Sequence, residues 1–408
     1  MKSFSASFLW GLLLTATTSP DVVLGDHPHN HDHNDGIDWT HMLDMPVARS
    51  DLTATSVFVN GRDKIFLFGG CAADQVRAPW DSSSFYCPTI TNRCDVFDPI
   101  TKEWNDGTKC TDAPRVRYRH TAVAVDNKIY LIGGVDGNDD AVNEIDVYDP
   151  SDGTWSIFGI WNATTDLASF VVDHDIYVVG GYKVPEYQAQ SSVYKFDTTA
   201  LSLSLTEEDS LKHARGDIFA AVSDHYVYIT GGWTHANGWA EPLETVERWH
   251  PPSGHGHGAE ESKWERVANM THNRGDKALM HMNGKIYAIG GENEADEKAV
   301  KVVEVFDEST GEWSDAGSIV DETFRFVAVA HEPTESIYIF GGQNFYNETC
   351  DCFKISKEVL RFVDMDWAID EIDAGGHDGH GHGPACIATL SSAIGGLALA
   401  FTVLALFA

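Results

Sequence analysis

Basic side chains are scarce in this chain. Its 408 residues hold 28 lysines and arginines against 62 aspartates and glutamates, so the formal net charge is −34 at pH 7. Coulomb repulsion between such a surface and a phosphate backbone argues against nucleic acid as a partner. Acidity of this kind is typical of a solvated surface, and weak association with divalent cations is the alternative.

Recognisable catalytic patterns are lacking too. The central part of the chain contains no nucleophile motif, no phosphate-binding loop and no metal-ligand spacing. The Gly-His and Trp-Asp pairs that mark the WD type of four-stranded repeat are also missing. The lack of catalytic motifs favours a binding module over an enzyme. The internal repeat is then the main signal in the chain.

Six short apolar strands, each followed by a double glycine, recur along the chain. The first reads KIFLFGG at 64–70 and the last SIYIFGG at 336–342. Neighbouring repeats are 47 to 64 residues apart, which is in the range of a four-stranded propeller blade. The second glycines of the six pairs are Gly70, Gly134, Gly181, Gly232, Gly291 and Gly342.

A second pattern follows several of the double glycines. Val-Phe-Asp or Val-Tyr-Asp is followed, seven residues after the aromatic ring, by Trp104, Trp155 and Trp313. The double glycine, the aromatic residue and the spaced tryptophan together resemble the kelch repeat over residues 39–367. This resemblance implies an all-β fold, a six-bladed kelch-type β-propeller with flexible His-rich termini. Glycine permits close backbone approach near a propeller axis, and aromatic rings fill the wedge between neighbouring blades.

Two tryptophans compete for the place of one outer strand. Trp39 and Trp367 both lie where a fourth strand belongs, which is one candidate more than six blades need. Closure through Trp39 would complete the sixth blade with the N-terminal segment. The sequence leaves this choice open.

Both ends of the chain have the composition of secretory signals. Residues 1–25 combine Lys2, an apolar run too short to cross a bilayer and small residues before Asp26, so we expect a removed signal peptide. Residues 387–408 form a 22-residue uncharged stretch with no basic flank behind it. This tail resembles a glycosylphosphatidylinositol attachment signal, with a transmembrane helix as the alternative. We therefore expect an extracellular or cell-surface protein that is bound to the membrane through its C-terminus.

The cysteine count fits that route. Seven cysteines occur, and one of them, Cys386, lies next to the apolar tail. An even set of six in a secreted chain indicates an oxidising compartment and up to three disulfides. We expect Cys87 and Cys94 to pair as a loop staple; the other connectivities stay open, and a metal site on these thiols is the alternative. The six are Cys71, Cys87, Cys94, Cys110, Cys350 and Cys352.

Three Asn-X-Ser/Thr sequons are candidate glycosylation sites. They begin at Asn162, Asn269 and Asn347, all in expected inter-strand loops.

Histidines concentrate in the His/Asp-rich segment 26–38, at 255–257 and in the Gly/His-rich spacer 368–386. Neutral imidazoles in such tracts can bind Zn, Cu or Ni, and a polar spacer that merely tolerates histidine is the alternative. The candidate metal ligands in the terminal tracts are His27, His29, His31, His33, His377, His380 and His382.

The resemblance to the kelch repeat also implies a ligand site. An arginine often opens the innermost strand of such blades, and in the family member that senses electrophiles these arginines hold acidic peptides. The resemblance thus implies a pocket for a carboxylate or acidic motif at one mouth of the channel. A structural role, in which each arginine pairs with a nearby acid and locks the blades, is the alternative. The candidates are Arg49, Arg119, Arg215, Arg274 and Arg325, with Asp166 in the corresponding region of the third blade.

Two classes of enzyme share this repeat. Copper-radical oxidases that look like kelch propellers need two tyrosines, two histidines and a cysteine at the channel mouth, and spacing does not assemble such a set from Cys71, His281 and His331. Six-bladed sugar mutarotases need only an arginine and an acid in the channel. Binding of an extracellular protein or an acidic ligand is the leading prediction, and an extracellular enzyme of either type is the alternative.

Overall fold

The computed structural model describes residues 37–79, 81–200, 206–236, 239–251, 263–293 and 299–364. The expected signal peptide, the three histidine tracts, Trp367, Cys386 and the apolar tail lie outside these ranges. Within them, the one helical element is the 3₁₀ turn η1 (Glu332–Thr334). No helix of the described ranges is long and apolar enough to span a bilayer.

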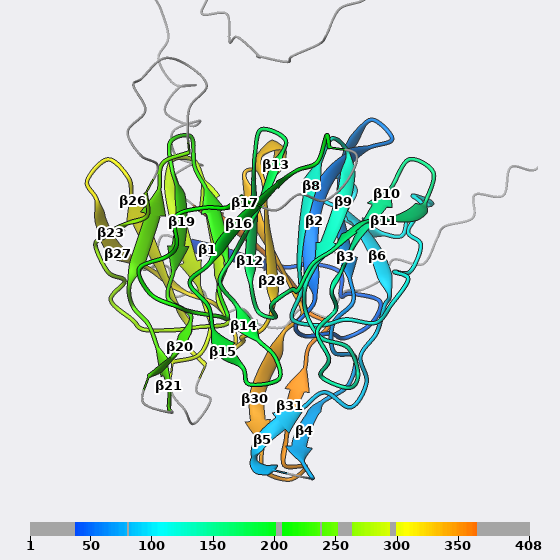
Figure 1. The fold of residues 1–408 in the computed structure, drawn as a ribbon. Coiled ribbons are helices and arrows are strands. Elements are labelled where there is room, and N and C mark those ends of the chain that lie inside the picture. Colours follow the sequence, from blue (N-terminus) through cyan, green and yellow to red (C-terminus); the bar gives the residue numbers. More distant parts are fainter. Residues whose placement is uncertain are drawn as a thin grey trace, which may run out of the picture. The chain divides into compact units, whose positions relative to one another are not determined.

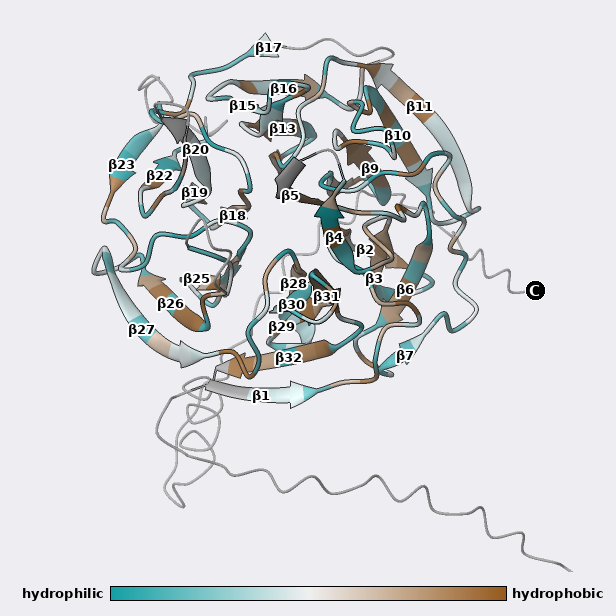
Figure 2. Cartoon of the chain, turned by 90° about the horizontal axis from the view of Figure 1, so that it is seen from below, coloured by the Kyte–Doolittle hydropathy of each residue, from teal (hydrophilic) through white to brown (hydrophobic). Residues whose placement is uncertain are grey.

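Four-stranded antiparallel sheets, arranged radially around a common axis, form the body of the described chain (Figures 1 and 2). This arrangement confirms the all-β propeller class. Six sheets share one strand order and are numbered here as blades 1 to 6. Their strands are β2 (Thr53–Val59), β3 (Arg62–Phe68), β6 (Cys94–Asp98) and β7 (Glu103–Trp104); β8 (Thr121–Val125), β9 (Lys128–Ile132), β10 (Glu144–Asp149) and β11 (Thr154–Ile160); β12 (Ala168–Val172), β13 (Asp175–Val179), β16 (Val193–Asp197) and β17 (Thr206–Glu207); β18 (Ala220–Val222), β19 (Val227–Thr230), β22 (Val246–Trp249) and β23 (Glu265–Val267); β24 (Ala278–Met282), β25 (Lys285–Ile289), β26 (Val302–Asp307) and β27 (Glu312–Ser318); and β28 (Val327–His331), β29 (Ser336–Phe340) and β32 (Val359–Asp364) with β1 (Ile37–His41).

The N-terminal strand β1 closes the ring. It pairs antiparallel with β32, and Trp39 lies opposite Phe362. The Trp39 indole also donates a hydrogen bond of 2.9 Å to the carbonyl oxygen of Ser318 in blade 5. The first and last parts of the propeller are thus held in one sheet, which is the closure through Trp39 that the sequence left open.

Aromatic side chains fill the wedges between blades, as expected. Between blades 1 and 2, the ring centroids of Phe68 and Tyr148 lie 5.4 and 4.8 Å from that of Trp155. The Trp155 indole donates to the carbonyl oxygen of Thr111 over 3.1 Å. Buried aromatic surface of this kind supplies much of the apolar stabilisation of each seam.

The double glycines lie where one blade meets the next. Gly70 has a φ of +97°, and its amide donates to the carbonyl oxygen of Arg117 in blade 2 over 2.9 Å. A Cβ on Gly70 would lie 2.6 Å from the carbonyl oxygen of Ser50. A larger residue would therefore clash and be strained, which explains this part of the repeat.

Extra strands extend the loops that follow the double glycines. Loops of blades 1 and 6 together form one further four-stranded sheet, the projecting sheet, which stands out from the propeller (Figure 1, bottom). Loops of blades 3 and 4 form one hairpin each. The projecting sheet consists of β4 (Gln75–Ala78), β5 (Asp81–Tyr86), β30 (Gln343–Asn347) and β31 (Cys352–Ile355), and the hairpins of β14 (Tyr182–Lys183) with β15 (Gln188–Ala189) and β20 (Trp233–Ala236) with β21 (Trp239–Pro242).

Three disulfides are formed: Cys71–Cys87, Cys94–Cys110 and Cys350–Cys352. The expected Cys87–Cys94 pair is wrong, because the two residues belong to different cores. Cys87 packs with Cys71 beneath the blade 1 loop. Cys94 begins strand β6 and packs in the seam between blades 1 and 2.

Candidate ligand site at the propeller axis

One residue from each blade faces the axis. Each of these six residues lies two or three residues before the first strand of its blade, and each has a positive φ of 50° to 56°. We call this set the axial ring. In chain order its members are Asp51, Arg119, Asp166, Asp217, Asp276 and Arg325.

A circle of backbone hydrogen bonds holds the axial ring. The amide of each member donates to the carbonyl oxygen of the preceding member, and the amide of Asp51 donates to Arg325, over 2.9 to 3.2 Å. Because the backbone fixes the six positions, side chains of like charge are kept close together. Local electrostatics alone would not favour such an arrangement.

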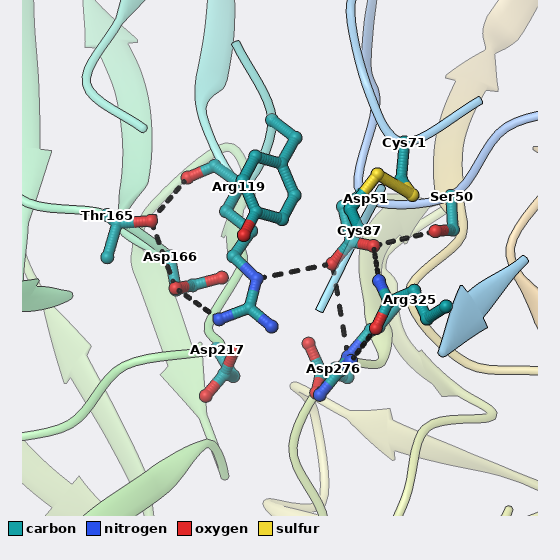
Figure 3. Close-up of polar contacts among 12 residues, drawn as sticks. Ser50, Asp51, Cys71, Cys87, Arg119, Thr165, Asp166, Asp217, Asp276 and Arg325 are labelled. Atoms are coloured by element: carbon teal, nitrogen blue, oxygen red, sulfur yellow. Dashed lines mark hydrogen bonds and ion pairs between the residues drawn. A yellow bond between two sulfur atoms is a disulfide. The ribbon is translucent and has the colours of Figure 1, made fainter. Parts of the chain in front are cut away.

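The two arginines share one aspartate. Arg119 lies 3.7 Å from Asp51 and 3.8 Å from Asp166, measured between guanidinium nitrogen and carboxylate oxygen (Figure 3). Arg325 lies 3.9 Å from Asp51 and 3.3 Å from Asp276. Asp51 therefore sits between two cations.

Asp217, on the opposite side of the axial ring, has a different environment. It accepts a hydrogen bond of 2.7 Å from the phenol of Tyr182. Burial, reinforced by the charges of Asp276 and Asp166, raises the pKa of Asp217 well above its usual range. Burial also raises the pKa of Asp166 to about 6, although the Arg119 guanidinium opposes the shift.

Asp276 is the ionised partner of Asp217. Burial favours its neutral form, but Arg325 and the hydrogen bonds that Asp276 forms with the Glu292 and Asp217 side chains lower its pKa below the usual range. Asp217 and Asp276 thus form a carboxyl pair in which Asp217 holds the proton.

A second layer of side chains surrounds the axial ring. The residue after each double glycine forms a β-bridge with the residue just before a ring member, and we call this layer the collar. The collar residues are Cys71, Val135, Tyr182, Trp233, Glu292 and Gln343.

The projecting sheet contacts the axial ring directly. The fully buried Gln75 of β4 donates to Asp51 over 2.9 Å and accepts from Arg325 over 3.1 Å. Gln75 begins β4, so only the length of that strand separates the outer end of the projecting sheet from the charges of the axial ring.

A cavity of about 150 Å³ includes the axial ring and the first strands of the blades. Small apolar residues of those strands form part of its wall, among them Ala54, Ala122, Ala168 and Ala220. The cavity can accept one side chain or a small molecule, with charged groups on the ring side and aliphatic groups along the strands.

The predicted five-arginine pocket is wrong for three of its members. Arg49, Arg215 and Arg274 are fully buried inside their blades, away from the axial ring. Arg215 pairs with Glu247 at 2.7 Å and donates over 2.9 Å to the carbonyl oxygen of Gly231. Corresponding ion pairs join Arg49 to Asp95 and Arg274 to Glu304. These arginines have a structural role, but not the expected one of pairing with a nearby acid to lock neighbouring blades. Each ties the segment before the first strand to the third strand of its own blade.

Arg117, not Arg119, is the blade 2 member of that buried set. It is fully buried and pairs with Asp146. Arg119 follows two residues later, at the ring position that Asp217 occupies after Arg215. The Arg-X-Asp spacing in blades 1, 4 and 5 carried this information, but residue type alone does not distinguish the two positions.

The residues considered for a copper-radical oxidase are not gathered. Cys71 is bound to Cys87 in a disulfide, so it has no sulfur available for a link to tyrosine. His281 lies 4.0 Å from Glu308, and His331 lies 4.0 Å from Asp63. In the described ranges no three His, Cys, Asp or Glu side chains are placed to hold a metal ion.

The sequons lie in loops or at a strand end. Asn162 and Asn269 are exposed, and Asn347 at the end of β30 is partly exposed.

Comparison with known proteins decides the family. The family model "KLHDC2/KLHL20/DRC7 Kelch-repeats domain" matches residues 37–232, and the "Kelch motif" model matches 214–271 and 273–318. The chain belongs to the kelch-repeat family. Among its relatives, the kelch protein is 28% identical over 166 residues to Kelch repeat and BTB domain-containing protein 1 of Ectromelia virus, covering 40% of this chain and 27% of the viral protein. It is 24% identical over 240 residues to human Kelch-like protein 23 and 23% identical over 222 residues to bovine Kelch-like protein 36. These matches cover 55% and 54% of this chain, and 36% and 34% of the relatives. The kelch protein thus corresponds to about a third of the length of these relatives.

Proposed function

We propose that this kelch propeller is a secreted or cell-surface binding module that engages a protein partner through the loops around the axial ring. The observation that carries the proposal is the position of the extra strands. All of them lie in loops that follow double glycines, and these loops begin next to the ring and collar. Variable loops on a rigid scaffold are the usual place for recognition.

The extracellular part of the proposal is supported by chemistry. All six cysteines of the described chain are paired, as expected for an oxidising compartment. The signal-peptide pattern of residues 1–25 and the exposed sequons agree with that route. We propose that the tail 387–408 is exchanged for a lipid anchor.

Phosphatidylinositol-specific phospholipase C applied to intact cells tests the anchor. Release of the protein into the medium is the expected result. Retention in the membrane together with release by detergent alone would contradict a lipid anchor and favour a spanning helix. Recovery from unpermeabilised cells only after lysis would overturn the surface location.

New glycans on opposite faces test the binding surface. Asp140→Thr creates a sequon at Asn138, in the loop that follows Gly134 beside the ring. Arg62→Thr creates one at Asn60, in the short turn between β2 and β3 at the other end of blade 1. Partners identified by surface proximity labelling should be lost with the first variant and kept with the second. The reverse pattern would contradict the proposed face.

A second candidate function is a sugar mutarotase. The observation that favours it is Asp166, a carboxyl with a pKa of about 6 in the axial cavity, since such a group can donate and accept a proton near neutral pH. Faster interconversion of galactose anomers, measured by polarimetry and abolished by Asp166→Asn, would support this function. A rate equal to that of buffer would eliminate it for this sugar.

A further inference from the structure

The charges around the axis are unbalanced. Four aspartates of the axial ring and Glu292 of the collar face two arginines. Asp51, Asp166 and Asp276 each pair with an arginine, and Glu292 lies 3.5 Å from Arg325. Among the described residues Asp217 forms no ion pair, so the ring lacks a cation on that side.

We propose that the axial ring accepts the cationic head of a lysine or arginine residue of the protein partner, beside Asp217. The inference rests on the proposed function and adds the chemistry of the partner. The proposed ligand is basic, whereas the sequence suggested an acidic one. Of the five candidate arginines only Arg119 and Arg325 reach the axis, and both already pair with aspartates.

A proton on Asp217 stands where that cation would bind. Asp217 is held protonated by burial and by the neighbouring carboxylates, and it hydrogen-bonds with Asp276. An ammonium or guanidinium N–H donor at this place would satisfy the same carboxylate oxygens and favour their ionised form. Binding therefore exchanges one proton for one cationic group.

Trp233 provides the second, independent observation. Its side chain is 8% exposed, and its indole N–H has no hydrogen-bond acceptor in the described part of the chain. The indole lies over the residue before Asp276, since a Cβ on Gly275 would be 2.2 Å from the Trp233 Nε1. An unsatisfied buried donor costs free energy, and a backbone carbonyl of an entering peptide would satisfy it. A ligand with a cationic group for Asp217 and a nearby carbonyl oxygen for the Trp233 indole has the chemistry of a lysine or arginine residue in a polypeptide.

The net charge of the whole protein also favours a basic ligand. With a formal net charge of −34, the protein attracts basic segments and repels acidic ones.

The pH dependence follows from the groups that face Asp217. As the pH falls, Asp166 is protonated at about 6 and the ring loses negative charge, so a basic ligand binds more weakly. An acidic ligand would bind more tightly under the same change. The charged and titratable groups around the site are Asp51, Asp166, Asp276, Glu292, Arg119, Arg325, Tyr118, Tyr182, Tyr187 and His120, whose pKa is lowered well below its usual value by burial.

Calorimetry on the full-length mature glycoprotein tests the proposal with three probes. They are the capped pentapeptide Gly-Gly-Lys-Gly-Gly, its norleucine counterpart and n-butylammonium. We expect the lysine peptide to bind at pH 7.5 at least about tenfold more tightly than the norleucine peptide, to release protons on binding, and to weaken severalfold at pH 5.5. Asp217→Asn should remove the proton release. Trp233→Phe should weaken the peptide and leave n-butylammonium unchanged, which distinguishes a protein-borne cation from a free amine.

Equal affinity of the lysine and norleucine peptides, or tighter binding of Gly-Gly-Glu-Gly-Gly as the pH falls, would overturn the proposal. The same heat and proton release with Ca²⁺ alone would overturn it as well. Partner capture that is blocked by the Asn138 glycan but unaffected by Asp217→Asn would refute this inference and leave the proposed function standing.

Discussion

The phenol of Tyr182 donates a hydrogen bond of 2.7 Å to Asp217, the ring carboxyl for which the described chain provides no cationic partner. The glycine before Asp217 makes this contact feasible, because a Cβ on Gly216 would lie 2.2 Å from the Tyr182 ring. Gly216 thus allows the Tyr182 phenol to reach the Asp217 carboxyl at the axis. Stability and binding should both depend on this arrangement.

Asp217→Asn should stabilise the protein at neutral pH. A carboxyl whose pKa is raised on folding destabilises the fold as the pH rises above its unfolded value of about 3.9. The melting temperature of the variant should therefore exceed that of the wild type at pH 7.5, with a smaller difference at pH 4.5. Calorimetry at the two pH values checks this, with Asp224→Asn in the exposed turn between β18 and β19 as control. An equal effect at both pH values would argue against a retained proton.

Arg215→Met should cost about 3–5 kcal/mol, because it leaves Glu247 buried without its partner. The double variant with Glu247→Leu should recover much of that loss. Arg248→Met is a matched control, since the ion pair between Arg248 and Glu265 is partly exposed and should be worth at most about 1 kcal/mol. Urea unfolding measures all four proteins. Similar losses for Arg215→Met and Arg248→Met would contradict a structural role for the buried pair within blade 4.

Replacing Cys94 and Cys110 by serine should lower the free energy of unfolding by about 3 kcal/mol, as expected for a loop of 16 residues. The Cys350–Cys352 pair closes a separation of only 2 residues, so its removal should cost less. Denaturant unfolding of the two double variants gives both values. A larger loss for the second pair would show that loop closure is not the main effect.

Deleting residues 26–41 should open the ring at blade 6. Without β1, strand β32 becomes an exposed edge, and its amides should exchange faster with deuterium. Strand β10 in blade 2, which keeps both neighbours, is the internal control. Unchanged protection of β32 would mean that β1 contributes little to closure.

The repeat was predictable from the sequence because its residues are required by local geometry. The double glycines tolerate no Cβ at the seams, and the spaced tryptophans fill wedges of nearly constant size. The axial ring was only partly predictable. Arg117 and Arg119 are both arginines near the start of one strand, yet one is buried in its blade and the other faces the axis. A shift of two residues decides between these roles, and it becomes visible only when the six blades are aligned in space.

The predicted pairing of Cys87 with Cys94 was wrong for a related reason. Cys87 and Cys94 are close in sequence, but strand β6 begins at Cys94 and places it in the seam with blade 2. Proximity along the chain does not determine which core a side chain enters.

The proposed cation site depends most on the axial ring being short of one cation, with a proton held on Asp217 in its place. Carbon-13 NMR of the aspartate carboxyl groups, titrated from pH 3 to 9, tests this directly. We expect one carboxyl to remain protonated at pH 7 and its signal to be absent from Asp217→Asn. Ionisation of every aspartate below pH 5 would contradict a proton held on Asp217.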